Sequence, residues 1–295
     1  AALALYVSSC GGRFSHPDTS KCAIKTDIDP FYKEVFSKTD ASTDEKASRL
    51  ENKYGEYFKA YCSGELRIGI PGDSDFVSNF NQFISYDENS EVIATCDSVY
   101  NEKITKQHAA IDDALSCMRF YFSDAKIPQN IYAHFSGFNS RFFVDSTYIS
   151  FGIEHYLGSN CRYYPMLEIP AYARRNKNAE NLKFDIVKAL IYSNYPDLSE
   201  KDDVLSAMIY QGKVLYATAA CLPNEPINKI LGFTDDEMKW LKQAEKQMWG
   251  YLAEQKLLYS TNPLDRNKLV NETPFTVFFG DKSPGRAALY CAYNI

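Results

Sequence analysis

The pair Glu154–His155 is the combination in this sequence that is best suited to acid–base chemistry. A carboxylate and an imidazole can exchange protons near neutral pH when they share a pocket. The pair follows a predicted strand, Tyr148–Ile153, and adjacent strand residues face opposite sides of a sheet. Both side chains therefore line one pocket only if the strand has ended before them. Otherwise the pattern indicates a strand-end glutamate and a hydrogen-bonded histidine, with a binding role for His155 beside Tyr163 and Tyr164 as the alternative.

The usual motifs of metal and nucleophilic catalysis are absent from the sequence. Its four histidines never lie three or four residues apart, so no helix face presents two imidazoles, and HExxH is missing. GxSxG, a P-loop and GxGxxG are missing as well. The eight cysteines include no CxxC pair, and a disulfide between Cys22 and Cys62 is one pairing that export would allow. We therefore expect no catalytic residue, no metal and no cofactor.

Two kinds of hydrophobic period divide the chain. Period-two patterns predict strands at Ile131–Phe138, Phe142–Asp145 and Tyr148–Ile153, with a turn at 145–147. A further short strand is predicted at Leu66–Ile70. Helical patterns surround these strands, so the sequence predicts an α+β fold that is mostly helical with a small antiparallel sheet.

Capping residues support several of the predicted helices. Ser42 or Thr43 with Glu45 indicates an N-cap within the helical region from Asp29 to Tyr61. Thr234, which precedes three acidic residues, is a second predicted N-cap. Ser283-Pro284 is expected to be the N-cap and first residue of the last helix. A long amphipathic helix is expected at 97–122, with its charged face in solvent.

The order of elements after the strand Tyr148–Ile153 resembles that of gluzincin peptidases, in which an edge strand precedes a helix with HExxH and a second helix with a glutamate ligand. Such zinc sites need three protein ligands and an open position. The matching positions are Ser193, Asp197 and Gln211, and a hydroxyl and an amide are poor zinc donors. Pro196 would also end the first helix early. We therefore expect a zincin-like architecture that lacks the zinc ligands.

The N-terminus has the pattern of an exported lipoprotein. Ala1–Val7 is apolar, as the end of a signal peptide is, and two serines precede Cys10. This arrangement resembles a bacterial lipobox, in which the cysteine carries several acyl chains that anchor the protein stably. Residues 11–26 are polar and predict a tether. Residues 27–295 predict one globular domain whose C-terminal helix is truncated.

Composition limits the remaining classes of function. The chain has 295 residues, a formal net charge of −6 and 45% hydrophobic residues, which is enough for a packed core. Apart from the pair Arg174–Arg175 no basic cluster forms, so we expect no nucleic-acid partner. No apolar run long enough to span a bilayer follows the signal remnant.

The second half of the chain resembles the GldB family of gliding-motility lipoproteins from Bacteroidetes-type bacteria. The matching pieces occur in the family's order over roughly 127–295, and SGFN, MIYQGK and SPGR are the most specific of them. They are IYAHFSGFNSRFFVDSTYISFGIEHYLG, YYPMLEIPAYARRN, AMIYQGKVLYATAACLPNEP, Trp249 with LLYST, and PFTVFFGDKSPGR.

The resemblance implies a lipid-anchored protein of the cell envelope with no established catalysis. The residues after Cys10 include no acidic run, which favours an orientation toward the periplasm. Its partners would be the membrane, through the acyl chains, and envelope proteins of a motility or secretion assembly. Arg174 and Arg175, at the end of an aromatic segment, are candidates for contact with such a partner.

Three functions remain open at this point. A non-catalytic binding or assembly component is favoured by the lipobox and by the absent zinc ligands. A hydrolase with an atypical site would use Glu154, His155 and Asp145. A glycan- or peptide-binding module would use Tyr163, Tyr164 and Tyr172.

Overall fold

The computed structural model describes residues 14–295, in which fourteen α-helices accompany four short strands. Cys10 and the lipobox lie outside the described residues. Two compact units are present. Unit 1 comprises residues 14–23, Asp113–Ala125 and Leu190–Ile295, and unit 2 comprises Ile24–Asp112 and Lys126–Ala189.

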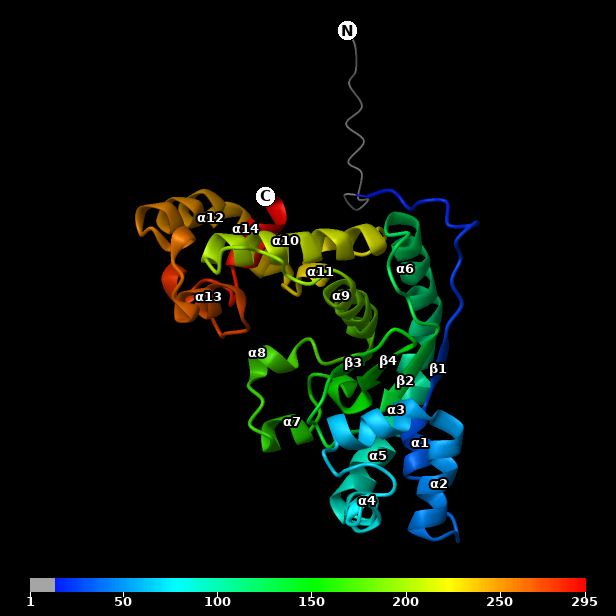
Figure 1. The fold of residues 1–295 in the computed structure, drawn as a ribbon. Coiled ribbons are helices and arrows are strands. Elements are labelled where there is room, and N and C mark those ends of the chain that lie inside the picture. Colours follow the sequence, from blue (N-terminus) through cyan, green and yellow to red (C-terminus); the bar gives the residue numbers. More distant parts are fainter. Residues whose placement is uncertain (1–13) are drawn as a thin grey trace. The chain divides into compact units, whose positions relative to one another are not determined.

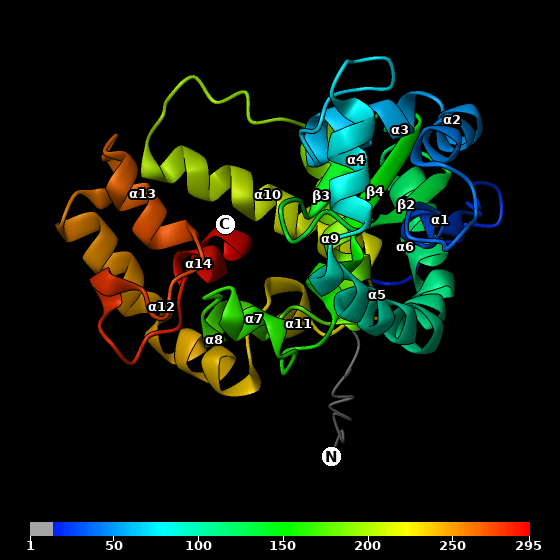
Figure 2. The same ribbon diagram turned by 90° about the horizontal axis from the view of Figure 1, so that it is seen from below.

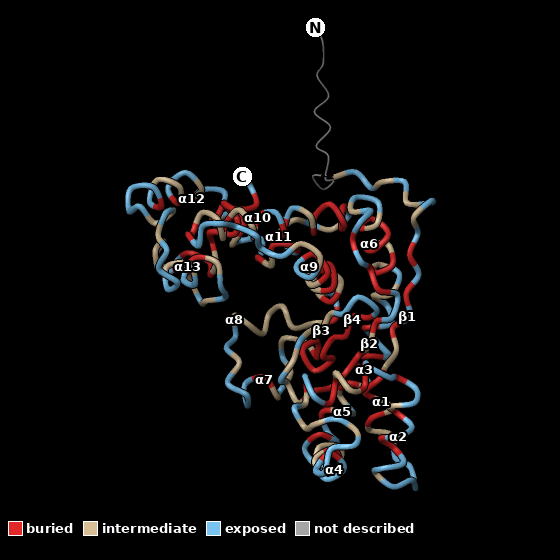
Figure 3. Tube along the Cα trace, viewed as in Figure 1, coloured by how far each residue is buried: buried red, intermediate tan, exposed pale blue. Residues whose placement is uncertain are grey.

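Unit 2 contains the sheet, whose strand order is β1-β2-β4-β3. The strands are β1 (Asp27–Asp29), β2 (Asn130–His134), β3 (Phe142–Val144) and β4 (Tyr148–Gly152). β1 and β4 both run parallel to β2, and β3 pairs with β4 in the antiparallel sense. Figure 3 shows β2 and β4 among the most buried parts of the chain, and all five residues of β4 are buried.

The mostly helical α+β fold is confirmed, but two details of the predicted sheet are wrong. The sheet is mixed, because β1 joins it in parallel from the far N-terminal side of the sequence. The strand predicted as an edge is β4, which lies between β2 and β3. Only the β3–β4 hairpin is local: Asp145 Oδ1 accepts hydrogen bonds from the Thr147 amide and hydroxyl and forms the predicted turn. Pairing between remote segments leaves no such local signal.

Four helices pack on one face of this sheet (Figure 1): α1 (Phe31–Val35), α2 (Thr43–Tyr54), α3 (Glu56–Ala60) and α4 (Phe76–Ile84). Phe31 has edge-to-face contacts with Tyr54, Tyr57 and Tyr61. Tyr57 also stacks on Tyr132 of the sheet, with ring centroids 4.1 Å apart. Aromatic pairs of this kind add to the stabilisation that burial alone provides.

The predicted strand Leu66–Ile70 is wrong. A π-helical turn, Tyr61–Glu65, leads instead into an irregular segment. Leu66 and Ile68 pack against the aromatic core, which produced the alternating pattern in the sequence. Positive φ angles at Arg67 (56°) and Gly69 (93°) interrupt the extended backbone that a strand needs.

The long helix expected at 97–122 is two helices, α5 (Asp87–Val99) and α6 (His108–Tyr121). A π-helical turn, Tyr100–Ile104, and a 3-10 turn, Thr105–Gln107, lie between them. Both turns depart from the α-helical spacing, so their side chains project differently from those of a straight helix. The predicted N-cap at Ser42 is confirmed, with a complete capping box to Glu45.

The C-terminal helices of unit 1 pack around α10 (Val204–Cys221), which contacts α14 (Ala288–Asn294) (Figure 2). A Cβ atom on Gly212 of α10 would lie 2.2 Å from the Ala292 carbonyl oxygen, so only glycine permits this approach. The boundary between the units falls within α6 and α9. The helices are α9 (Leu182–Asn194), α10 (Val204–Cys221), α11 (Ile227–Leu231), α12 (Asp235–Glu254), α13 (Pro263–Val270) and α14 (Ala288–Asn294).

The helix ends of unit 1 confirm one prediction and correct another. Thr234 caps α12 through a capping box with Glu237, as expected. Ser283 is not an N-cap, because α14 begins only at Ala288 and the Ser283 hydroxyl donates to the Gly280 and Thr276 carbonyls. Among the described residues, no helix is both long enough and apolar enough to cross a membrane.

Candidate functional site

The carboxyl ends of β2 and β4 meet at one edge of the sheet, because the two strands are parallel and His134 pairs with Gly152. The loop at 136–139 follows β2, and a 3-10 turn, Ile153–Tyr156, follows β4. Loops beyond the carboxyl ends of parallel strands are where ligands bind in many folds with parallel sheets. The 3-10 turn carries Glu154 and His155, so the strand has ended before both of them.

Glu154 inserts its carboxylate into the loop after β2. Its Oε1 atom accepts hydrogen bonds from the Ser136 amide (2.7 Å), the Ser136 hydroxyl (2.8 Å) and the Phe138 amide (3.2 Å). Gly137 and Phe138 both have a φ of 67°. Left-handed residues of this kind turn successive amides toward one point and create an anion site. The group held here is a side chain of the protein itself.

Burial governs the protonation of Glu154, whose residue is 0% exposed. Desolvation raises the pKa of its carboxyl to about 7, and the hydrogen bonds from Ser136 and Phe138 oppose that rise. Such a pKa suits a general acid or base. General catalysis would also need access to substrate, and this carboxyl is enclosed.

The two buried histidines of this region are held neutral. Desolvation lowers the pKa of His134 to about 4 and that of His155 to about 3, and the Lys177 charge contributes to the shift at His155. His155 Nδ1 accepts a hydrogen bond from Lys177 Nζ at 3.0 Å. His134 Nδ1 lies 3.2 Å from the Ser150 hydroxyl. Both rings therefore act as neutral hydrogen-bonding groups at physiological pH.

The two tyrosines predicted beside His155 have different environments. Tyr164, on α7 (Tyr163–Met166), is fully buried. Its hydroxyl donates to the Glu154 carbonyl (2.9 Å) and accepts from the Leu157 amide (3.0 Å). It therefore braces the turn that carries Glu154. Tyr163 is only half-buried and accepts a hydrogen bond from Arg162.

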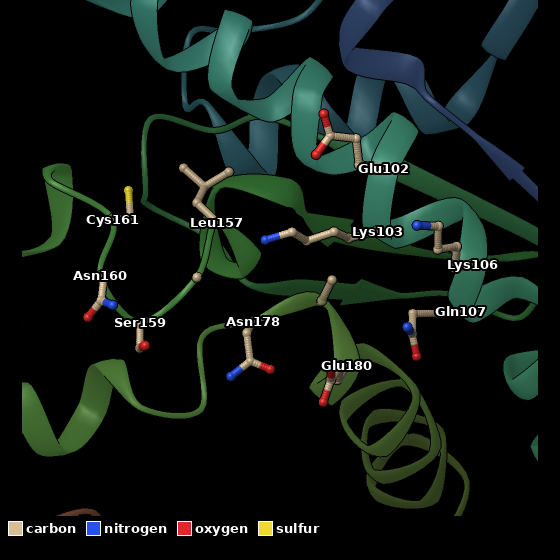
Figure 4. A pocket seen from close by; sticks show the side chains of 12 residues that line it. Glu102, Lys103, Lys106, Gln107, Leu157, Ser159, Asn160, Cys161, Asn178 and Glu180 are labelled. Atoms are coloured by element: carbon tan, nitrogen blue, oxygen red, sulfur yellow. The ribbon is translucent and has the colours of Figure 1, made fainter.

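An open cavity lies just beyond this turn (Figure 4). Its volume is about 830 Å³, and one wall consists of residues 157–161, joined to 178–180 by the bridge between Leu157 and Asn178. The opposite wall is the π-helical and 3-10 region before α6. The lining residues are Glu102, Lys103, Lys106, Gln107, Leu157, Gly158, Ser159, Asn160, Cys161, Asn178, Ala179 and Glu180.

The lining of this cavity is polar and balanced in charge. Lys103 extends across it toward Leu157, while Asn178 and Glu180 lie on the other side (Figure 4). Two lysines and two glutamates offset one another, and amides and a hydroxyl supply donors and acceptors. Neither Glu154 nor His155 belongs to the lining.

The sequence does not predict this cavity, because the charged face at 97–122 has the pattern of a solvated helix face. The one available signal was the pairing of Lys103 and Lys106, three residues apart in a helical pattern. The partner wall comes from residues 157–161 and 178–180, and no local pattern connects those segments with the lysines.

Comparison with known families decides the identity of the chain. A family model described as gliding motility protein GldB matches residues 13–295. The chain belongs to the GldB family. No curated protein and no solved structure gives a significant match.

Membership in the GldB family confirms the resemblance, and the match extends to the N-terminal region, which had shown little similarity. It implies a gliding-motility protein of the cell envelope. Several of the pieces that carried the resemblance have a structural role in this GldB-family protein. SGFN is the loop that binds Glu154, and Ser283 of SPGR ties the chain before α14.

Two of the three positions matched to zinc ligands form hydrogen bonds with other residues in this GldB-family protein. Ser193 is an exposed residue of α9, which ends two residues before Pro196, as expected. Asp197 accepts hydrogen bonds from the amide and hydroxyl of Ser199. Gln211, on α10, accepts one from the Tyr192 hydroxyl at 2.6 Å. The similarity of the fold to zincins stays a prediction.

The two arginines that were candidates for partner contact come at the end of a short helix, α8 (Ala171–Arg174), with Arg175 as its C-cap. Both are half-buried. Of the predicted binding residues, the structure therefore brings Glu154, His155 and Tyr164 together in one buried region. Tyr163, Arg174 and Arg175 are only half-buried.

Proposed function

We propose that this GldB-family protein is a non-catalytic, lipid-anchored envelope component that binds a polar peptide segment of another envelope protein in the cavity of Figure 4. The family match supports the envelope and motility context. One observation supports the proposal most directly. Glu154 is enclosed, whereas the lining of the open cavity contains no carboxylate–imidazole pair.

The environment of Glu154 supports a structural role. Three donors satisfy Oε1, and the side chain is inaccessible to solvent. A buried carboxyl group that accepts three hydrogen bonds from one loop organises that loop, and its enclosure keeps it from a substrate. His155 is likewise held by Lys177 and stays neutral.

The chemistry of the cavity favours a peptide over a glycan. Backbone amides and carbonyls of an extended peptide can pair with Asn160, Asn178 and Gln107, and Lys103 can meet an acidic side chain or a carboxylate. The lining contains no aromatic ring on which a sugar could stack. Tyr164, one of the tyrosines considered for sugar binding, is fully buried.

Site-specific crosslinking tests the proposal in whole cells. A photoreactive amino acid at Asn160 should yield one protein adduct in native envelopes, and the same group at the exposed Glu200 should not. Lys103→Ala with Lys106→Ala should reduce that adduct at least fivefold and impair gliding, whereas Lys239→Ala, a matched exposed lysine, should leave both unchanged. Unaltered crosslinking and gliding in the double variant, or an adduct that contains only glycan, would overturn the proposal.

Glu154→Gln separates binding from catalysis. The amide keeps an acceptor for the Ser136 and Phe138 amides but cannot transfer a proton as a carboxylate does. Gliding and the Asn160 adduct should both persist in this variant if Glu154 is structural. A folded Glu154→Gln protein that supports no gliding while forming the normal adduct would favour the hydrolase.

The lipid anchor at Cys10 belongs to the same proposal and rests on the small residues that precede that cysteine. Cys10→Ser in the intact gene product should move the protein from the membrane fraction to the soluble fraction and abolish labelling by a fatty-acid analogue. Membrane association that survives the substitution would exclude acylation as the anchor.

A further inference from the structure

Three side chains of different chemistry converge in unit 1. Asp113 and Cys117 lie four residues apart on α6, so they share one face of the helix. His16 approaches them from the N-terminal segment. Its Nε2 atom lies 2.9 Å from Asp113 Oδ1 and 3.6 Å from Cys117 Sγ. One nitrogen, one oxygen and one sulfur atom thus fall within 4.8 Å of one another.

The orientation of the His16 ring is fixed by a hydrogen bond that faces away from this cluster. Nδ1 lies 2.8 Å from the Pro17 carbonyl oxygen, and since that oxygen can only accept, Nδ1 must donate. In a neutral ring Nε2 then presents a lone pair toward the Asp113 carboxylate. Two acceptors at 2.9 Å repel one another unless a proton or a metal cation lies between them.

We propose that His16, Asp113 and Cys117 bind a zinc ion, which fastens the N-terminal segment to α6. The donor set of imidazole, thiolate and carboxylate is the one that zinc selects in proteins. A backbone carbonyl that holds the non-ligating nitrogen, as Pro17 does for His16, is the usual second contact of a zinc-bound histidine.

The two separations that involve His16 Nε2 are close to those of tetrahedral coordination. Bonds of about 2.0 Å to nitrogen and 2.3 Å to sulfur separate these donors by about 3.6 Å at the tetrahedral angle, which is the separation between His16 Nε2 and Cys117 Sγ. The nitrogen–oxygen separation would have to open from 2.9 Å to about 3.3 Å. Asp113 can make that shift, because its side chain is 46% exposed.

Zinc binding would change the state of Cys117. The residue is 0% exposed, and burial raises the pKa of its thiol to about 12, so the thiol keeps its proton when no cation is present. On binding, the S–H bond breaks, the sulfur lone pair forms the bond to zinc and the proton passes to solvent. Any proton on His16 Nε2 leaves in the same step.

Metal titration of the full chain, freed of metal by a chelator and carrying no histidine tag, tests the site. We expect one equivalent of Zn²⁺ to bind, with release of at least one proton. Co²⁺ should bind in its place and give a thiolate-to-cobalt charge-transfer band in the near ultraviolet. His16→Ala and Asp113→Asn should each weaken zinc binding at least tenfold.

Two further variants define the outcome. Cys117→Ser should abolish the cobalt band, and His108→Gln, a histidine on the same helix that contacts Thr26, should change nothing. If the buried Cys117 variant fails to fold, the exposed His16 variant still decides the matter. Absence of stoichiometric binding, or binding that is unaltered in His16→Ala, would overturn the site.

Discussion

Glu154 and Asn160 come from the same short stretch of chain, yet one is enclosed in the interior and the other lines an open cavity. Around Glu154, the Ser136 amide and hydroxyl donate to Oε1 of the carboxylate, and the Tyr164 hydroxyl donates to the Glu154 carbonyl. Around Asn160, lysines, glutamates and amides face solvent. Glu154, the residue best suited to acid–base catalysis, thus organises a loop, and less reactive side chains line the accessible cavity.

The most severe test of this difference is Glu154→Ala. The substitution leaves the Ser136 and Phe138 donors buried without their acceptor and opens a small cavity. We expect a loss of about 3–5 kcal/mol in the free energy of unfolding, measured by urea denaturation. Glu200→Ala, an exposed glutamate, should change stability by no more than about 0.5 kcal/mol. Equal stability of Glu154→Ala and wild type would show that the carboxylate does not organise the loop.

A smaller effect is expected from Gly152→Ala. The added Cβ would lie 2.4 Å from the Ser140 carbonyl oxygen and 3.2 Å from Glu154 Oε2. The backbone at Gly152 has a φ of −73°, so crowding alone would act. We expect a loss of up to about 3 kcal/mol, read from the same denaturation curves. Gly250→Ala on α12, where nothing lies within 4 Å, should be neutral or slightly stabilising; similar losses at both sites would refute close packing at Gly152.

The pH dependence of stability should report on Glu154 directly. Its pKa rises from 4.5 to about 7 on folding, so between these values the folded protein holds a proton that the unfolded chain has released. Stability from this group is therefore fully present below pH 4.5 and is lost as the pH rises through 7.

Comparison with Glu154→Gln isolates that contribution, since His134 and His155 titrate in both proteins. The free energy of unfolding of the wild type relative to that of the variant should fall by about 3 kcal/mol between pH 4.5 and pH 7.5. Thermal or urea unfolding at a series of pH values measures it. A difference that stays constant with pH would mean that the carboxyl is not buried as described.

Substitutions in the cavity should impair binding and leave the stability of the fold unchanged. Lys103→Ala with Lys106→Ala removes two exposed side chains whose contacts are mostly with solvent. We expect the free energy of unfolding to change by less than about 0.5 kcal/mol, although binding of the partner segment is lost. Calorimetric unfolding checks the first point, and a large destabilisation would place these lysines in the structural framework instead.

The sequence was informative where the structure is local. The turn at 145–147, the capping boxes of α2 and α12 and the end of α9 before Pro196 each depend on neighbouring residues, and all were predicted. β1 was missed, because its three residues pair with a segment about one hundred positions away. The strand expected at Leu66–Ile70 failed for a related reason, since alternating burial can arise without extended backbone.

The candidate site was predicted in part. Glu154, His155 and Tyr164 were singled out from their residue types, and the structure brings them together. The loop at 136–139 supplies the donors that hold Glu154. The positive φ angles of Gly137 and Phe138 shape this loop and cannot be deduced from composition. The cavity and the cluster at His16 both join segments that are remote in sequence, and neither left a pattern within one segment.

The pairing of β1 with β2 has a consequence for the order of events during synthesis. Asp27–Asp29 leaves the ribosome or a translocation channel long before Asn130–Tyr132, its partner in the sheet. Closing so long a loop carries an entropic penalty that slows folding. The β2–β4–β3 part of the sheet can form from adjacent segments, so β1 joins late. Until it does, β2 offers an open strand edge to chaperones, proteases and neighbouring chains.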